Sequence, residues 1–194
     1  MKATVRRKKV EESWRRKEKS IWKKVTEGWF GYIFYALLGI VIAFFLNMSL
    51  GLALNTDLPV VAVVTSSMVH DDSTEINHYQ WLEKNFGYTR EYIDSWPIPN
   101  GFSAGDLPII QGSDEYHIGD VIVYSVPGQK TPIIHRIVKI NPDGTYVTKG
   151  DHNPGLLPFE HSVRKEWIHG KVIFIIPKLG YFKVVISKLL GGLA

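Results

Sequence analysis

The sequence predicts a mainly β domain behind an N-terminal transmembrane helix, and three observations support this prediction. Residues 28–56 contain no charged side chain and are mostly large and apolar. Before them, residues 1–27 hold eleven Lys and Arg against four Asp and Glu. After them come short runs rich in β-branched residues, separated by Gly and Pro turns and without alternating helices. That pattern is typical of a β-rich domain.

The apolar stretch 28–56 is long enough to cross a bilayer, because about 20 apolar residues suffice for a spanning helix. Trp29, Tyr32 and Tyr35 gather near its N-terminal end, where aromatic side chains favour the membrane interface. A cleavable signal peptide is the alternative, and small residues near the end of the stretch would allow cleavage. The apolar core of a signal peptide is usually only about 7–15 residues long, however. We therefore interpret 28–56 as a retained transmembrane anchor.

The charge on the two sides of the anchor predicts its orientation. Basic segments tend to stay in the cytoplasm, so residues 1–27 are expected to form a cytoplasmic tail and the rest of the chain to lie outside. The same basic run could serve as a nucleic-acid patch. Beside a membrane span, a topogenic and lipid-facing role is favoured. We therefore expect membrane lipid as a partner and no nucleic acid.

Residues 57–176 are predicted to form the β-rich domain. Five runs in it read as strands: 58–64, 117–126, 132–140, 145–151 and 170–176. The segment 68–116 is insertion-like, with a short helix expected near 78–86 and a Pro-rich break at 96–101.

The C-terminal segment 177–194 is apolar but is interrupted by Lys178, Lys183 and Lys188. It is predicted to be amphipathic or membrane-associated, with a second membrane span as the weaker alternative. The chain has no cysteine, which excludes disulfides, thiolate metal ligands and a cysteine nucleophile.

The run "VVTSSM" places three hydroxyl residues where an apolar strand is expected to end. Thr65, Ser66 and Ser67 could simply close the strand by bonding nearby backbone groups. Alternatively, one of them is a nucleophile held at the edge of a rigid element. The residues of this run do not decide between the two interpretations.

A hairpin further along could supply the base for such a nucleophile. "NPDG" at 141–144 is a strong turn signal. A three-residue loop after Asn141 would place His135 opposite Asp151 on the same side of the sheet, within hydrogen-bonding reach. A two-residue loop would place Gly150 there instead. The geometry thus permits a Ser–His–Asp arrangement without requiring it.

Two other chemistries are less well supported by the sequence. Lys139 and Lys149 lie on the same hairpin, but a lysine base needs a pKa lowered by burial, and neither run is apolar enough to predict that. We expect no metal site and no cofactor, because five of the histidines show no compact ligand spacing: His117, His135, His152, His161 and His169.

Four motifs follow one another behind the anchor: "SSM", "GDVIVY", "IIHRIVKI" and "TKGDHNPG". In this order they resemble type I signal peptidase, and the histidine is similar to the archaeal and endoplasmic-reticulum branch. The resemblance implies a signal-peptidase-type fold and a membrane-bound serine endopeptidase that removes signal peptides from exported preproteins after small residues. It also implies a single-pass protein of the cell membrane or an endoplasmic-reticulum-type membrane, with the translocation machinery as a candidate partner. The alternative is a non-catalytic, membrane-anchored peptide-binding or secretion-complex subunit of the same fold.

The resemblance also implies roles for particular residues. Ser67 becomes the nucleophile, His135 the general base and Asp151 the acid partner. Thr65 falls where a hydroxyl assists the Ser67 N–H group in holding the oxyanion. A shallow apolar wall that accepts small side chains is implied for Val63, Met68, Ile133 and Ile134.

Two positions depart from the family pattern. His70 stands where the family usually has a proline, and Leu157 stands where relatives often carry a second aspartate. Glu160, three residues further on, could substitute for that aspartate if the loop is reshaped.

Overall fold

The computed structural model describes residues 14–18, 20, 23, 28–70 and 77–181. The chain forms two compact units, residues 1–49 and 50–194, and each is described by itself. Most of the predicted basic tail and C-terminal segment lies outside the described residues, so their predicted roles stay predictions.

Helix α2, Trp29–Leu54, forms over the stretch predicted as the anchor. Within the described part of the chain it is the one helix long and apolar enough to cross a membrane, with a mean hydropathy of 2.3 over its most apolar window. Its 26 residues correspond to about 39 Å at the usual rise per residue. Large apolar side chains such as Tyr32 and Phe44 are exposed on it. These properties fit a lipid-facing helix.

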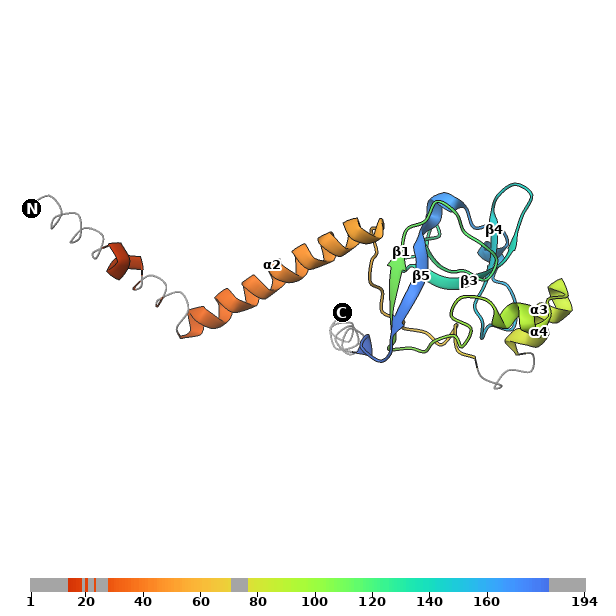
Figure 1. The fold of residues 1–194 in the computed structure, drawn as a ribbon, viewed down its shortest axis with the longest axis horizontal. Helices are drawn as coiled ribbons and strands as arrows, with labels where there is room; N and C mark the ends of the chain where they lie inside the picture. Colours follow the sequence, from red (N-terminus) through yellow and green to blue (C-terminus); the bar gives the residue numbers. More distant parts are fainter. Residues whose placement is uncertain (1–13, 19, 21–22, 24–27, 71–76, 182–194) are drawn as a thin grey trace, which may run out of the picture. The chain divides into compact units, whose positions relative to one another are not determined.

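The second unit is built on one antiparallel sheet of five strands in the order β1-β5-β2-β3-β4 (Figure 1). A mainly β domain behind an N-terminal apolar helix is therefore confirmed. The strands are β1 Leu107–Gln111, β2 Val121–Tyr124, β3 Ile133–Ile140, β4 Tyr146–Lys149 and β5 Ile168–Ile176.

Four of the five predicted strands are present, with ends shifted by up to four residues, but the prediction for 58–64 is wrong. That segment forms only an isolated bridge, from Val60 to Ile109 of β1. It is held beside β1 by scattered backbone bonds, such as Val63 N–H to the Asp106 carbonyl at 3.0 Å. Pro59 on this segment and Pro108 on β1 both lack an N–H group. A regular ladder of hydrogen bonds between the two segments therefore cannot form.

Two helices cover one face of the hairpin β3–β4. They are α3, His78–Phe86, and α4, Arg90–Asp94. Trp81 and Leu82 of α3 pack in one buried cluster with Val138 of β3 and Val147 of β4. The opposite face carries a separate cluster that includes Ile137. Neighbouring residues of β3 thus point into different surroundings, as strand alternation requires.

The register of β3 against β4 changes along the hairpin. Near the turn, Asn141 N–H donates to the Thr145 carbonyl at 2.8 Å, which is the predicted three-residue loop. A bulge between Ile137 and Lys139 then shifts the pairing by one residue. Beyond it, Arg136 pairs with Lys149, so the continuation of the ladder brings Gly150 opposite His135.

Candidate functional site

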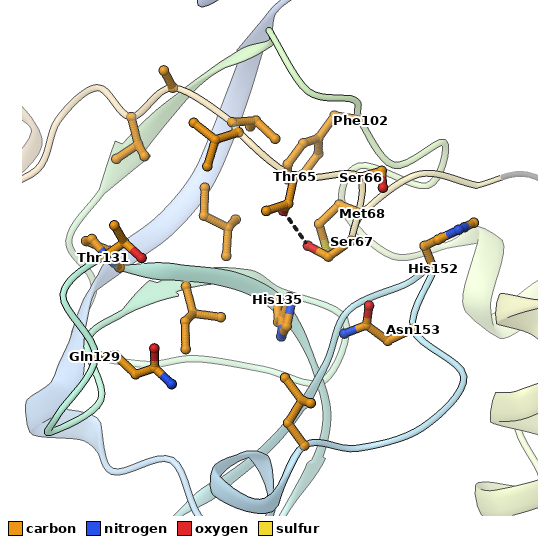
Figure 2. A pocket seen from close by; sticks show the side chains of 18 of the residues that line it. Thr65, Ser66, Ser67, Met68, Phe102, Gln129, Thr131, His135, His152 and Asn153 are labelled. Atoms are coloured by element: carbon orange, nitrogen blue, oxygen red, sulfur yellow. Dashed lines mark hydrogen bonds between the residues drawn. The ribbon is translucent and has the colours of Figure 1, made fainter. Parts of the chain in front are cut away.

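A cavity of about 600 Å³ opens between the segment 61–68 and the start of β3. Both Ser67 and His135 line it, and Figure 2 shows them supplied by different elements. The other predicted site residues in the lining are Val63, Thr65, Met68, Ile133 and Ile134. All the predicted residues except Asp151 therefore meet in one cavity. Gln129, Thr131 and Asn153 also line it and were not predicted.

A tight turn holds Ser67 at the cavity. Val69 N–H donates to the Ser66 carbonyl at 3.1 Å, and His152 N–H donates to the Ser67 carbonyl at 2.9 Å. Met68 is only 1% exposed and anchors the turn in the apolar core. Its burial leaves Ser67 half-buried at the cavity wall. The Thr65 and Ser67 hydroxyl oxygens lie 3.2 Å apart, so one donates to the other.

His135 is buried on β3, and its Nδ1 donates a hydrogen bond to the Glu160 carboxylate. Glu160 lies in the short 3-10 helix η1, Pro158–His161, and is fully buried. Its second oxygen accepts the Leu157 N–H at 2.5 Å, which fixes the carboxylate. A carboxylate on Nδ1 leaves Nε2 of the neutral ring as the acceptor. A histidine held in this way can take a proton from a nearby hydroxyl.

The expected pairing of His135 with Asp151 is wrong. The Asp151 carboxylate instead accepts from Arg136, the next residue on β3, with Nη2 at 2.7 Å and Nε at 3.0 Å. Consecutive strand residues point to opposite faces, and the bulge has moved the register by one. The acid that meets His135 is therefore Glu160.

Asp151 is the centre of a buried polar network on the side of α3. His70 Nε2 lies 2.7 Å from one of its oxygens, and His78 Nδ1 lies 3.4 Å from the other. Burial alone would raise the pKa of Asp151, but Arg136 and the His70 hydrogen bond outweigh it and hold that pKa below its usual value. Burial lowers the pKa of His78 to about 4. Asp151 is thus a buried anion whose charge Arg136 already balances.

Lys149 corrects a second expectation, because it is only 1% exposed. Burial lowers its pKa to about 8, which is the kind of shift that a lysine base requires. Its Nζ, however, donates to the carbonyls of Gly150 and Asp151 at 2.8 and 3.2 Å, and Lys149 is absent from the cavity lining. The ammonium therefore stabilises the loop after β4 and does not face Ser67.

A second Ser–His–Asp chain lies elsewhere in the domain. His169 Nδ1 contacts Asp57 at 2.8 Å, and its Nε2 contacts the Ser125 hydroxyl at 2.7 Å. None of these three residues lines the cavity that holds Ser67. A hydrogen-bonded series of Ser, His and Asp therefore does not by itself identify a nucleophile. Ser125, His169 and Asp57 provide a matched control for the residues at the cavity.

Curated proteins from several fungi are similar to this chain. The signal peptidase complex catalytic subunit SEC11 of Komagataella phaffii is 29% identical over 161 residues, which cover 75% of this chain and 77% of the relative. The proteins of the same name from Lachancea thermotolerans and Chaetomium globosum are 34% and 31% identical over 99 and 98 residues. Those two matches cover 45% of this chain and 59% and 57% of the relatives. No family model matches the chain.

The chain thus combines an apolar helix that is a candidate membrane span with a β-rich domain, and its relatives are named as catalytic subunits of a signal peptidase complex. In sequence the chain is similar to type I signal peptidases of the endoplasmic-reticulum branch. The resemblance carried by the four sequence motifs is thereby confirmed.

Proposed function

We propose that the chain is a membrane-bound serine endopeptidase that cleaves signal peptides from preproteins after small residues. The supporting observation is the convergence of Ser67 and His135 on one cavity, with Glu160 hydrogen-bonded to the far side of the imidazole. This arrangement supplies a nucleophile, a base and an acid that orients the base.

In the proposed reaction, Ser67 Oγ attacks the scissile carbonyl while His135 Nε2 takes the hydroxyl proton. Glu160 keeps the ring in the correct tautomer and stabilises the imidazolium that forms. The Ser67 N–H group and the Thr65 hydroxyl receive the developing oxyanion. The imidazolium then protonates the leaving amine, and water hydrolyses the acyl-enzyme by the same steps.

The apolar wall accounts for the preference for small side chains. Val63 and Met68 face the cavity from one segment, and Ile133 and Ile134 face it from β3. Val63 and Met68 also belong to the buried core, so their side chains cannot easily be displaced to admit a large residue. Small residues before the cleavage site are typical of signal peptides.

The proposed topology keeps the N-terminal tail in the cytoplasm and the catalytic domain on the outer or lumenal side. Tethering by α2 raises the effective concentration of the active site where a translocated preprotein emerges. The names of the relatives include a signal peptidase complex. We therefore propose complex subunits and the translocation machinery as partners, in an endoplasmic-reticulum-type or cell membrane.

Cleavage of a synthetic preprotein by the detergent-solubilised full chain tests the proposal. Ser67→Ala should lower the rate by roughly 10⁵- to 10⁶-fold, as the loss of a serine nucleophile does. Ser66→Ala and Ser125→Ala are the controls, one beside Ser67 and one in the second Ser–His–Asp chain, and both should keep cleavage. A dead Ser66→Ala or Ser125→Ala variant beside an active Ser67→Ala variant would refute the proposed nucleophile.

A further inference from the structure

The network around Asp151 contains a feature that the proposed reaction does not use. Among the described residues, His70, His78 and Asp151 form a group of three side chains that each offer one metal-ligand atom. These atoms all lie within 4.8 Å of one another. His70 and His78 come from different elements, and their rings stack with centroids 4.5 Å apart. The spacing of the histidines in the sequence did not indicate this group.

The clearest sign of a missing partner is His78. Its side chain is only 4% exposed, and among the described residues its Nδ1 has no hydrogen-bond partner, although it lies 3.4 Å from an Asp151 oxygen. An unpaired buried polar atom is costly and calls for an explanation. Because burial lowers the pKa of His78 to about 4, the ring is neutral at neutral pH, which is the form that binds a metal ion.

Arg136 leaves room for a metal ion on the carboxylate. A carboxylate offers about four lone-pair positions, and the guanidinium takes those on its own side. The remaining positions face the two histidines. One oxygen accepts a hydrogen bond from His70, and His78 Nδ1 lies 3.4 Å from the other. Arg136 is also held by the carbonyls of Pro97, Ile98 and Gly119, so it does not depend on Asp151 alone. Carboxylates that bind metals are commonly oriented by such an outer hydrogen bond.

We propose that His70, His78 and Asp151 form a site for a divalent transition metal ion, with Zn²⁺ as the best match. Two imidazoles and one carboxylate are a donor set that Zn²⁺ accepts, with the fourth position open to water. Ligand bonds of about 2.0–2.1 Å place the donor atoms of a tetrahedral site roughly 3.3 Å apart. His70 Nε2 lies 2.7 Å from one Asp151 oxygen and His78 Nδ1 lies 3.4 Å from the other, and these two distances bracket that value. On binding, two metal bonds replace the His70–Asp151 hydrogen bond.

Such an ion would join three segments that control the Ser67 turn. His70 is three residues after Ser67, and His78 begins α3. Asp151 directly precedes His152, whose N–H group holds the Ser67 carbonyl. The site is therefore structural, and its existence does not depend on the proposed peptidase activity.

Metal binding to the full-length protein in detergent tests the site without an activity assay. After removal of metal with a chelator and titration with Zn²⁺, we expect one tightly held Zn²⁺ per chain by elemental analysis and a saturable rise in the unfolding temperature. Co²⁺ should give the strong visible absorption of a tetrahedral complex. Both signals should be lost in His70→Ala and in His78→Ala.

His117→Ala is the matched control, because its side chain is 70% exposed and lies outside the group. It should bind Zn²⁺ as the wild type does. If His78→Ala fails to fold, the partly exposed His70 decides the test through His70→Ala. A wild-type chain that neither retains Zn²⁺ nor gains thermal stability from it would overturn the proposal. So would retention of the ion by a folded His70→Ala variant, which would mark the binding as adventitious.

Discussion

The two acids Glu160 and Asp151 both lie beside strand β3, and both are almost fully buried. Glu160 meets His135, and Asp151 meets Arg136, the next residue on the same strand. The two pairs lie on opposite faces of β3, because the side-chain period of a strand is two. A motif can therefore place an acid near a base in sequence while the fold gives that base a different partner.

The two acids also differ in the charge that balances them. Asp151 is neutralised by a guanidinium that is 1% exposed, and this pair holds the pKa of Asp151 low. Glu160 accepts only from His135 and from the Leu157 N–H group among the hydrogen bonds of the described residues. Its negative charge is thus available to stabilise an imidazolium. These contacts support Glu160 as the acid of the proposed reaction and Asp151 as part of the architecture.

The largest difference in cleavage rate is expected between substitutions of the two acids themselves. We expect Glu160→Gln to lower the cleavage rate by roughly 10³- to 10⁴-fold, because an amide at this place favours the wrong tautomer of the base. Asp151→Asn should destabilise the fold, since it leaves the Arg136 charge buried without its anion. Its folded fraction should still cleave. The cleavage rate per folded molecule, with folding followed by circular dichroism, checks the predictions for both variants. Slow cleavage by Asp151→Asn together with normal cleavage by Glu160→Gln would reverse the assignment.

A smaller effect is expected at Gly150, which the register shift brings opposite His135. A Cβ atom there would lie 2.8 Å from His135 Nε2 and 2.6 Å from Asn153 Nδ2. Gly150→Ala should therefore displace the base and slow cleavage by about 10- to 100-fold, the cost of a displacement on the order of 1 Å. Gly155→Ala is the control on the same loop, because nothing lies within 4 Å of its added Cβ. Equal rates for the two variants would show that the ring is not confined as described.

The smallest effect on cleavage is expected at Lys149. Lys149→Met should keep cleavage, because the ammonium does not line the cavity. Its signature lies in stability instead. With a folded pKa of about 8 against 10.5 for the free side chain, the unfolded state binds the extra proton between these values. The free energy of unfolding should then rise by up to about 3 kcal/mol from pH 8 to 10.5.

Urea unfolding at a series of pH values measures this rise, which should be missing in Lys149→Met. The variant corrects for the tyrosines that titrate in the same range. A rise of the same size in both proteins would show that Lys149 is not desolvated. Loss of cleavage in Lys149→Met would instead reopen the choice between a lysine and a histidine base.

The sequence was sufficient for most of the fold. Residues 132–140 and 78–86 carry clear strand and helix patterns, and both elements form within one residue of the prediction. Strand β1 was missed, because it contains Pro108 and lies within a polar, aromatic segment of the sequence. The prolines also explain why 58–64 looked like a strand by composition but could not form a ladder.

The site was only partly predictable. Ser67 and His135 follow from motifs that stay local in the sequence. The partner of His135 depends on a one-residue bulge near Val138 and on the path of the chain to Glu160, and neither leaves a compositional signal. The Leu157 departure was the one available hint, because Glu160 follows it three residues later in the same loop.

The most direct test of the central assignment observes the imidazole of His135 itself. In ¹⁵N-labelled, detergent-solubilised protein, the Nδ1–H proton of His135 should appear strongly deshielded by the Glu160 carboxylate. The pairing of His135 with Glu160 predicts that this signal moves or disappears in Glu160→Gln and keeps its position in Asp151→Asn. A signal that is unchanged in Glu160→Gln and lost in Asp151→Asn would contradict it.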